Sequence, residues 1–234
     1  MGKDSASWGL YVGSKFENFI FFPPLRRIFG QVRSTIDFRK VMDEGKILLV
    51  NLAKGDLTET NARFLGMILL AKLQAAAMSR SDTARDNRRP FHVYVDEFGA
   101  IATRFFVSLL SEGRKFGISL VLANQFINQI NDENIRDAIF GNVGTIVAFR
   151  TGHDDAVRLT HEFYPGPAPR DLVHLPNWRA YVRAVVRGQR VPAFVLETIP
   201  LDPVRDDLAV ARARAVSREI YGTRAVDSQS VAAE

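Results

Sequence analysis

Apolar residues gather in short runs along this chain, and polar or glycine-containing stretches separate them. Four such runs, rich in β-branched residues, lie at residues 47–52, 92–95, 118–123 and 144–149. Their hydrophobicity is continuous rather than alternating, which is typical of strands that are covered on both faces. These runs therefore predict the strands of a buried sheet.

Helical patterns lie between these runs. Residues 58–78 predict a long helix with Thr58 as its N-cap and apolar residues at i+3 and i+4 spacing. Shorter helices are expected at residues 104–116, 134–140 and 153–163. Strands that alternate with helices favour an α/β fold with a mostly parallel sheet and helices on both faces.

The end of the chain has a different pattern. Two further apolar runs, at residues 180–186 and 191–196, predict a β-hairpin with a short glycine-containing turn. Asp202 and Pro203 predict the start of a C-terminal helix that ends near residue 221. The expected organisation is a lead-in segment at 1–30, the core at 31–200, the C-terminal helix at 201–222 and a disordered tail at 223–234.

Composition and charge narrow the classes of function. Hydrophobic residues make up 47% of the 234 positions and charged residues 24%, which is ordinary for a globular protein with a sizeable core. The chain has no cysteine, which excludes disulfide scaffolds, thiolate metal sites and cysteine nucleophiles. A net charge of +5 allows a polyanionic partner without establishing one. The apolar stretches at 19–22 and 66–73 are too short to span a bilayer.

The sharpest candidate for chemistry is the end of the second run, where Asp96 and Glu97 follow the letters HVYV. An apolar strand that ends in Asp-Glu is the Walker B pattern of P-loop ATPases, and it delivers both carboxylates to the edge where open α/β sheets bind ligands. The Asp can hold the water shell of Mg²⁺, and the Glu can polarise the attacking water. A solvated strand end without any chemistry would give the same pattern.

Two polar residues farther along support the chemical interpretation. Gln125 follows the strand expected at 118–123, where a γ-phosphate sensor lies in RecA-like motors. Arg114 precedes that strand near the end of a helix, from which an arginine finger can project toward a neighbouring subunit. The simpler alternative is that Arg114 is a helix C-terminal charge and Gln125 a turn residue.

Taken in order, these motifs resemble the conjugative coupling proteins of bacteria, which are the TraG/TraD-type ATPases of type IV secretion within the HerA/FtsK superfamily. The resemblance extends from about residue 29 to residue 198. The segments that carry it are 45–52 (GKILLVNL), 94–98 (YVDEF), 111–117 (SEGRKFG), 122–125 (LANQ), 141–145 (GNVGT), 149–150 (FR) and 154–156 (DDA).

The resemblance implies a RecA-like P-loop NTPase core, a motor domain that forms a hexameric ring. Such a ring drives DNA, single- or double-stranded, with ATP and Mg²⁺ bound between subunits. It implies that Asp96 serves Mg²⁺ and that Glu97 is the catalytic base. It gives Gln125 the sensor role and Arg114 that of the finger, and makes Arg150 a second candidate for contacting phosphate. It further implies relaxosome or secretion-system proteins as partners. The expected location is cytoplasmic, at the inner face of a bacterial inner membrane if other segments or chains hold it there.

The chain departs from this family in one respect. It contains no Gly-x-x-x-x-Gly-Lys-Ser/Thr, and the nearest approach, residues 9–15 (GLYVGSK), has the wrong spacing. Without that loop nothing cradles the phosphates, so we expect no ATP turnover by this chain alone. The favoured interpretation is a piece of a longer ATPase whose P-loop lies upstream. The alternative is an inactive RecA-like module for ring assembly or partner docking, and a sequence-specific DNA-binding regulator ranks below both.

Overall fold

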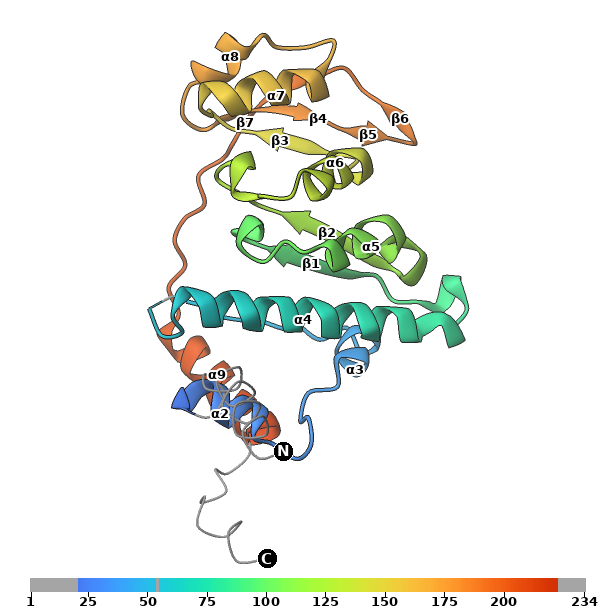
Figure 1. Cartoon of the computed structure of the whole chain (residues 1–234), viewed down its shortest axis with the longest axis vertical. Coiled ribbons are helices and arrows are strands. Elements are labelled where there is room, and N and C mark those ends of the chain that lie inside the picture. Colours follow the sequence, from blue (N-terminus) through green and yellow to red (C-terminus); the bar gives the residue numbers. More distant parts are fainter. Residues whose placement is uncertain (1–20, 54, 223–234) are drawn as a thin grey trace, which may run out of the picture. The chain divides into compact units, whose positions relative to one another are not determined.

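The computed structural model describes residues 21–53 and 55–222 (Figure 1). The chain divides into two compact units, one made of residues 1–37, 51–62 and 204–234 and the other of residues 38–50 and 63–203. In the first unit lie α2 (Pro23–Phe29) and α9 (Asp207–Tyr221). The expected tail and most of the expected lead-in segment fall outside the described residues, so both stay predictions.

The second unit holds the elements that position the candidate site. In chain order they are α3 (Phe38–Asp43), most of α4 (Glu59–Ser79), β1 (Phe91–Val95), α5 (Arg104–Glu112), β2 (Ile118–Leu122), α6 (Glu133–Asn142), β3 (Ile146–Ala148), α7 (His153–Phe163), α8 (Pro169–Val173), β4 (Arg179–Arg183), β5 (Val185–Val186), β6 (Gln189–Arg190) and β7 (Phe194–Glu197). Strands alternate with helices up to α8, and the predicted α/β class is confirmed.

The strand pairing is parallel in one place and antiparallel elsewhere. β1 and β2 form a parallel pair in which Phe91 lies opposite Ile118 and Val95 opposite Leu122. In the other sheet β4 lies between β3 and β7 and is antiparallel to both. The parallel pair carries the candidate site, because its two carboxyl ends share one edge.

The predicted β-hairpin is confirmed. β4 pairs with β7, and the short strands β5 and β6 close its far end. Arg187 and Gly188 form the turn with φ of 51° and 78°. Positive φ at both central residues is the type I′ arrangement, whose twist matches that of the flanking strands.

One expected strand is absent. Residues 47–52 have no regular secondary structure, and the side chains of Ile47 and Leu49 are 88% and 86% exposed. An apolar run becomes a strand only where a neighbouring strand completes its hydrogen bonds, and no strand pairs with this run among the described residues. The prediction of a strand here is wrong.

The start of the C-terminal helix also differs from the prediction. α9 begins at Asp207, and the Asp206 carboxylate accepts a hydrogen bond from the Ala209 N–H at 2.8 Å. That bond satisfies one of the free N–H groups of the first turn, which is what defines an N-cap. Asp202 and Pro203 precede the helix without belonging to it.

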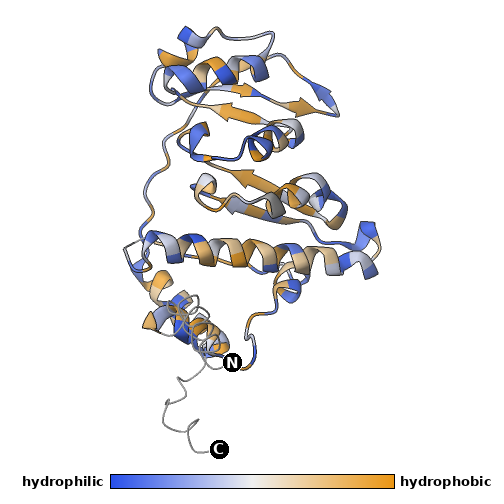
Figure 2. Ribbon diagram, viewed as in Figure 1, coloured by the Kyte–Doolittle hydropathy of each residue, from blue (hydrophilic) through white to orange (hydrophobic). Residues whose placement is uncertain are grey.

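Two clusters of buried side chains form the core of the second unit, and Figure 2 shows apolar residues concentrated on its strands. The larger cluster joins α4, β1, α5 and β2 through residues that include Leu73, Val93, Phe106 and Ile118. The smaller one joins β3, α7 and α8. By length and composition the helical stretch Glu59–Asp82 could also cross a membrane. A core helix passes the same test, and α4 supplies core residues.

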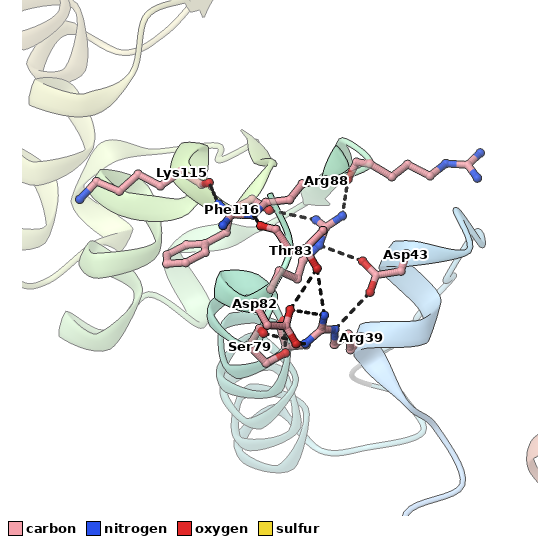
Figure 3. A network of polar contacts seen from close by, with 11 residues as sticks. Arg39, Asp43, Ser79, Asp82, Thr83, Arg88, Lys115 and Phe116 are labelled. Carbon is pink, nitrogen blue, oxygen red and sulfur yellow. Dashed lines mark hydrogen bonds and ion pairs between the residues drawn. The ribbon is translucent and has the colours of Figure 1, made fainter. Parts of the chain in front are cut away.

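A polar network ties the end of α4 to the entrances of β1 and β2 (Figure 3). Arg80 is fully buried and donates to the carbonyls of Phe116 at 2.9 Å and Arg89 at 2.6 Å, just before each strand begins. Its Nε lies 2.9 Å from the Asp43 carboxylate of α3. Arg80 therefore fixes the spacing of the two strands at their amino ends.

Arg39 of α3 extends this network at the surface. Its guanidinium donates two hydrogen bonds to the Asp82 carboxylate, at 2.8 Å and 2.5 Å, and a third to Asp43 at 3.2 Å. The Arg39 hydrogen bond, with a smaller contribution from Thr83, holds the pKa of Asp82 below its usual range. Hydrogen bonds to Asp82 and, to a smaller extent, Asp43 raise the pKa of Arg39. The network thereby joins α3 to the turn that follows α4.

Candidate active site

The candidate site lies where β1 and β2 end. The ladder between them continues past both strands, because Ala123 N–H donates to the Val95 carbonyl at 2.9 Å and Phe98 N–H donates to the Ala123 carbonyl at 3.0 Å. Parallel strands have their carboxyl ends at the same edge, so residues 96–97 and 124–125 become neighbours there. This edge is where open α/β sheets bind their ligands.

Glu97 and Gln125 meet directly at this edge. The Gln125 side-chain amide donates a hydrogen bond to the Glu97 Oε1. Asp96 is exposed, and its Oδ1 accepts the N–H of Glu97 at 3.0 Å. The structure thus brings together the three residues predicted as metal-binding carboxylate, catalytic base and sensor.

The backbone of Glu97 is in the left-handed region, with φ of 50° and ψ of 41°. For a residue with a side chain this conformation costs roughly 1–2 kcal/mol. It directs the chain from β1 into the short 3₁₀ turn η3 (Phe98–Ala100) while the carboxylate stays against Gln125. Residues held in this way concentrate at functional sites, which fits a chemical role for Glu97.

The buried side chain of Phe98 holds this turn in place. Phe98, the residue after Glu97, is 1% exposed, and its ring centroid lies 4.5 Å from that of Phe106 in α5. Burial of an aromatic side chain of this size contributes about 2–3 kcal/mol. The carboxylate of Glu97 is therefore attached to a turn that the core fixes.

Asn124 joins the two loops of the site, a role that the sequence reasoning missed. Its Oδ1 accepts the Gly99 N–H at 3.1 Å, and its Nδ2 donates to the Phe126 carbonyl. A Cβ on Gly99 would lie 2.9 Å from the Gln129 Cβ, so the approach requires glycine. The available signal was a pair of consecutive polar residues at the end of an apolar strand.

Asp155 is a second residue whose role the sequence did not indicate. It is 7% exposed, and its Oδ2 accepts the Ile127 N–H at 3.1 Å. This bond links the first turn of α7 to the loop that follows β2. The sequence reasoning included Asp155 only in a family motif and as an acid in a first helical turn.

The two remaining candidates are Arg114 and Arg150. Arg114 belongs to the 3₁₀ turn η4 (Gly113–Phe116), which precedes β2, so it lies at the amino end of the parallel pair and is exposed. Arg150 is exposed in the loop between β3 and α7. Within the described part of the chain no hydrogen bond or ion pair joins either side chain to Asp96, Glu97 or Gln125. Their predicted roles stay predictions.

The residues present fit Mg²⁺ that is held jointly with phosphate. No group of three or more potential metal-ligating side chains occurs in the described ranges. Asp96 offers a carboxylate of which one oxygen is used by the Glu97 N–H. Mg²⁺ in proteins commonly has one or two carboxylate contacts and takes its remaining ligands from water and substrate phosphates. This donor set matches that mode.

A family model described as the TraM recognition site of TraD and TraG matches residues 90–160. The matched part runs from the start of β1 into α7 and contains every candidate residue of the site. Over these residues the chain is similar to that family. No curated protein sequence matches the chain.

The solved structures with distant similarity to this chain include the following three. The unbound bacterial conjugative coupling protein TrwB, without its first 70 residues, has a TM-score of 0.44 at 14% identity, over 55% of this chain and 35% of that one. TrwB in complex with ADP and Mg²⁺ has a TM-score of 0.46 at 14% identity, over 55% of this chain and 34% of that one. The genome packaging NTPase B204 of Sulfolobus turreted icosahedral virus 2, in complex with AMPPCP, has a TM-score of 0.47 at 13% identity. The match covers 81% of this chain and 93% of that one. The chain thus spans about a third of the TrwB structures.

Proposed function

We propose that this chain is part of a hexameric, DNA-translocating ATPase of the conjugative coupling-protein kind. The observation that carries the proposal is the hydrogen bond between Gln125 and Glu97 at the carboxyl edge of the parallel pair. A carboxylate and an amide held together there can align water and sense phosphate at once. The TraG/TraD-type match over residues 90–160 supports the family to which the motor is assigned.

In the proposed reaction Glu97 orients and polarises the water that attacks the γ-phosphate. Asp96 would hold Mg²⁺ through its water shell, and the ion would supply positive charge to the phosphates. Gln125 donates to Glu97 and turns to the γ-phosphate when nucleotide is bound, so that occupancy of the site moves the loop after β2. Asn124 and Asp155 keep that loop attached to η3 and α7. Arg114 serves the neighbouring subunit's nucleotide, and Arg150 is a second phosphate contact.

The proposed partners follow from this assignment. They are DNA, further copies of the chain in a ring, and relaxosome or secretion-system proteins. The proposed location is the cytoplasm, at the inner face of a bacterial inner membrane where other segments or chains attach it.

The test uses a longer natural protein that carries these residues behind a P-loop, because this chain has no Gly-x-x-x-x-Gly-Lys-Ser/Thr. Gln125→Ala should lower the kcat of DNA-stimulated ATP hydrolysis by roughly 10²-fold, as the loss of one positioned donor does. Gln129→Ala is the matched control, since Gln129 is an exposed glutamine of the same loop. Full DNA-stimulated turnover by Gln125→Ala would remove the main support for this function.

The missing P-loop favours one alternative, an inactive module for ring assembly or partner docking. This module would keep the fold and bind no nucleotide. The two functions separate in the same assay, because an inactive module predicts no DNA-stimulated hydrolysis by any protein that contains these residues.

A further inference from the structure

β7 is an edge strand whose whole length is open to solvent. It pairs with β4 on one side, and no strand pairs with its other side among the described residues (Figure 1). Phe194, Val195 and Leu196 are 45%, 48% and 43% exposed. Beyond the strand Ile199 is 86% exposed. Proteins rarely leave an apolar edge unprotected unless another chain pairs with it.

The register of the hairpin shows which backbone groups face outward. Thr198 N–H donates to the Trp178 carbonyl at 2.7 Å, and bonded and non-bonded pairs alternate along an antiparallel ladder. Val195, opposite Tyr181, is therefore in a non-bonded position. Its N–H and carbonyl point away from β4, where an added strand would bond to them.

A hollow of about 370 Å³ lies beside the same stretch of β7. Val195 and Tyr181 contribute to its wall, together with Leu175 and Pro176. Its charged and polar lining consists of Arg170, Asp171, His174 and Arg179. A residue on an added strand would have its side chain on this face of the sheet at every second position.

The exposed guanidinium of Arg170 is the group in the hollow that can bind an acidic side chain. Asp171 is already engaged, since its Oδ2 accepts the Ala168 N–H at 2.8 Å. The Arg170 side chain is 85% exposed and lies 3.7 Å from Asp171, which leaves most of its donors available. A carboxylate that entered between Arg170 and His174 would gain charge-assisted hydrogen bonds.

We propose that the edge of β7 binds an extended peptide segment of a partner protein, which adds as a strand and directs an acidic side chain into the hollow beside Arg170 and His174. Main-chain hydrogen bonds supply general affinity in this mode of recognition, and pockets for alternate side chains supply specificity. The apolar side chains at neighbouring positions of the peptide lie over Phe194 and Leu196.

A second copy of the same strand fits the hollow less well. The acidic residue of β7 is Glu197, and it is paired with Arg179 of the adjacent strand at 3.4 Å. β7 therefore brings no free carboxylate to the hollow of another copy. A partner that carries its own acidic residue matches the charges better.

The experiment pans a phage-displayed library of random nonapeptides against the 234-residue chain. We expect selected peptides to alternate apolar residues and to share one Asp or Glu. The best peptide, labelled with fluorescein, is then titrated against variants by fluorescence anisotropy. Val195→Pro removes the outward N–H without touching a bond to β4, and Arg170→Glu reverses the charge at the hollow. Each should weaken binding by about tenfold or more.

Matched variants distinguish the proposal from simpler effects. Arg170→Lys keeps the charge and should stay within about threefold of the wild type. Arg212→Glu makes the same change of net charge on the exposed face of α9 and should leave affinity unchanged. Circular dichroism checks that Val195→Pro is folded. Arg170→Glu changes an exposed side chain and should not affect folding.

Three results would overturn the proposal. They are a library that yields no binder, binders without a shared acidic residue, and binders whose affinity neither variant changes. Sedimentation of the chain alone tests self-association. A dimer that Val195→Pro converts to monomers, together with an absence of peptide binding, would assign the edge to a second copy instead.

Discussion

Arg80 gives the sharpest prediction about stability, because its side chain is buried and multiply bonded. Its two terminal nitrogens donate to the carbonyls of Phe116 and Arg89, and its Nε lies beside Asp43. We consider Arg80→Met, which fills much of the same volume without a charge or a donor. This change leaves both carbonyls without their partner, and Asp43 keeps only its ion pair with Arg39.

The magnitude follows from these contacts. Each carbonyl that loses its donor costs about 1–2 kcal/mol, toward the lower part of the usual range because Arg89 is exposed and Phe116 only partly buried. The side chain of Asp43 is 40% exposed, so its lost ion pair adds less than about 1 kcal/mol. The free energy of unfolding should fall by about 3 kcal/mol, which is a large part of the 5–15 kcal/mol typical of a folded domain.

Urea unfolding followed by circular dichroism measures this change. At an m-value of about 2 kcal/mol per M, the midpoint should fall by about 1.5 M. The matched control is Arg85→Met, since Arg85 is exposed in the neighbouring turn η2 (Arg85–Asn87) and should change stability by less than about 0.5 kcal/mol. Hydrogen exchange adds a local readout, because β1 and β2 amides should exchange faster in Arg80→Met. Equal midpoints for the two variants would refute the role assigned to Arg80.

Three further predictions concern the proposed chemistry. The purified 234-residue chain should hydrolyse ATP no faster than a blank, and turnover that Glu97→Gln abolishes would contradict this. In a P-loop-containing parent, Glu97→Gln should lower kcat by roughly 10²-fold or more while ATP still binds. Asp96→Ala should instead weaken Mg²⁺-dependent ATP binding. An equal loss of ATP affinity in both variants would show that this division of roles is mistaken. In the same parent, Arg114→Ala subunits mixed with subunits that lack a working P-loop should recover activity, because a finger typically supplies about 10³–10⁵ in rate to its neighbour. Mixed rings without activity would exclude a finger at Arg114.

The sequence predicted the elements of this chain best where one local signal had no rival. α7 occupies residues 153–163 as expected, because its acidic first turn and apolar stripe agree. The run at 47–52 had an equally strong pattern and is not a strand, because pairing depends on a distant partner that local pattern cannot indicate. The start of α9 was missed for a related reason, since several Asp residues could cap it and only Asp206 makes the bond.

The sequence allowed the main residues of the candidate site to be predicted, but not the residues that hold its loops in place. Asp96, Glu97 and Gln125 follow apolar strands, and parallel strands place such residues together. Asn124 and Asp155 act through hydrogen bonds to backbone groups of other loops. Those partners are set by tertiary packing, so no spacing along the chain reveals them.

The left-handed backbone of Glu97 affects how knock-out substitutions at this position should be chosen. Glycine adopts this backbone conformation without strain, so Glu97→Gly would remove the carboxylate and relieve the strain at the same time. The measured effect would then understate the contribution of the carboxylate. A β-branched replacement such as Glu97→Val would add steric cost of its own and exaggerate it. Glutamine keeps both the shape and the strain of the native residue. Among these alleles, only Glu97→Gln separates the chemistry of the carboxylate from the geometry of the turn that carries it.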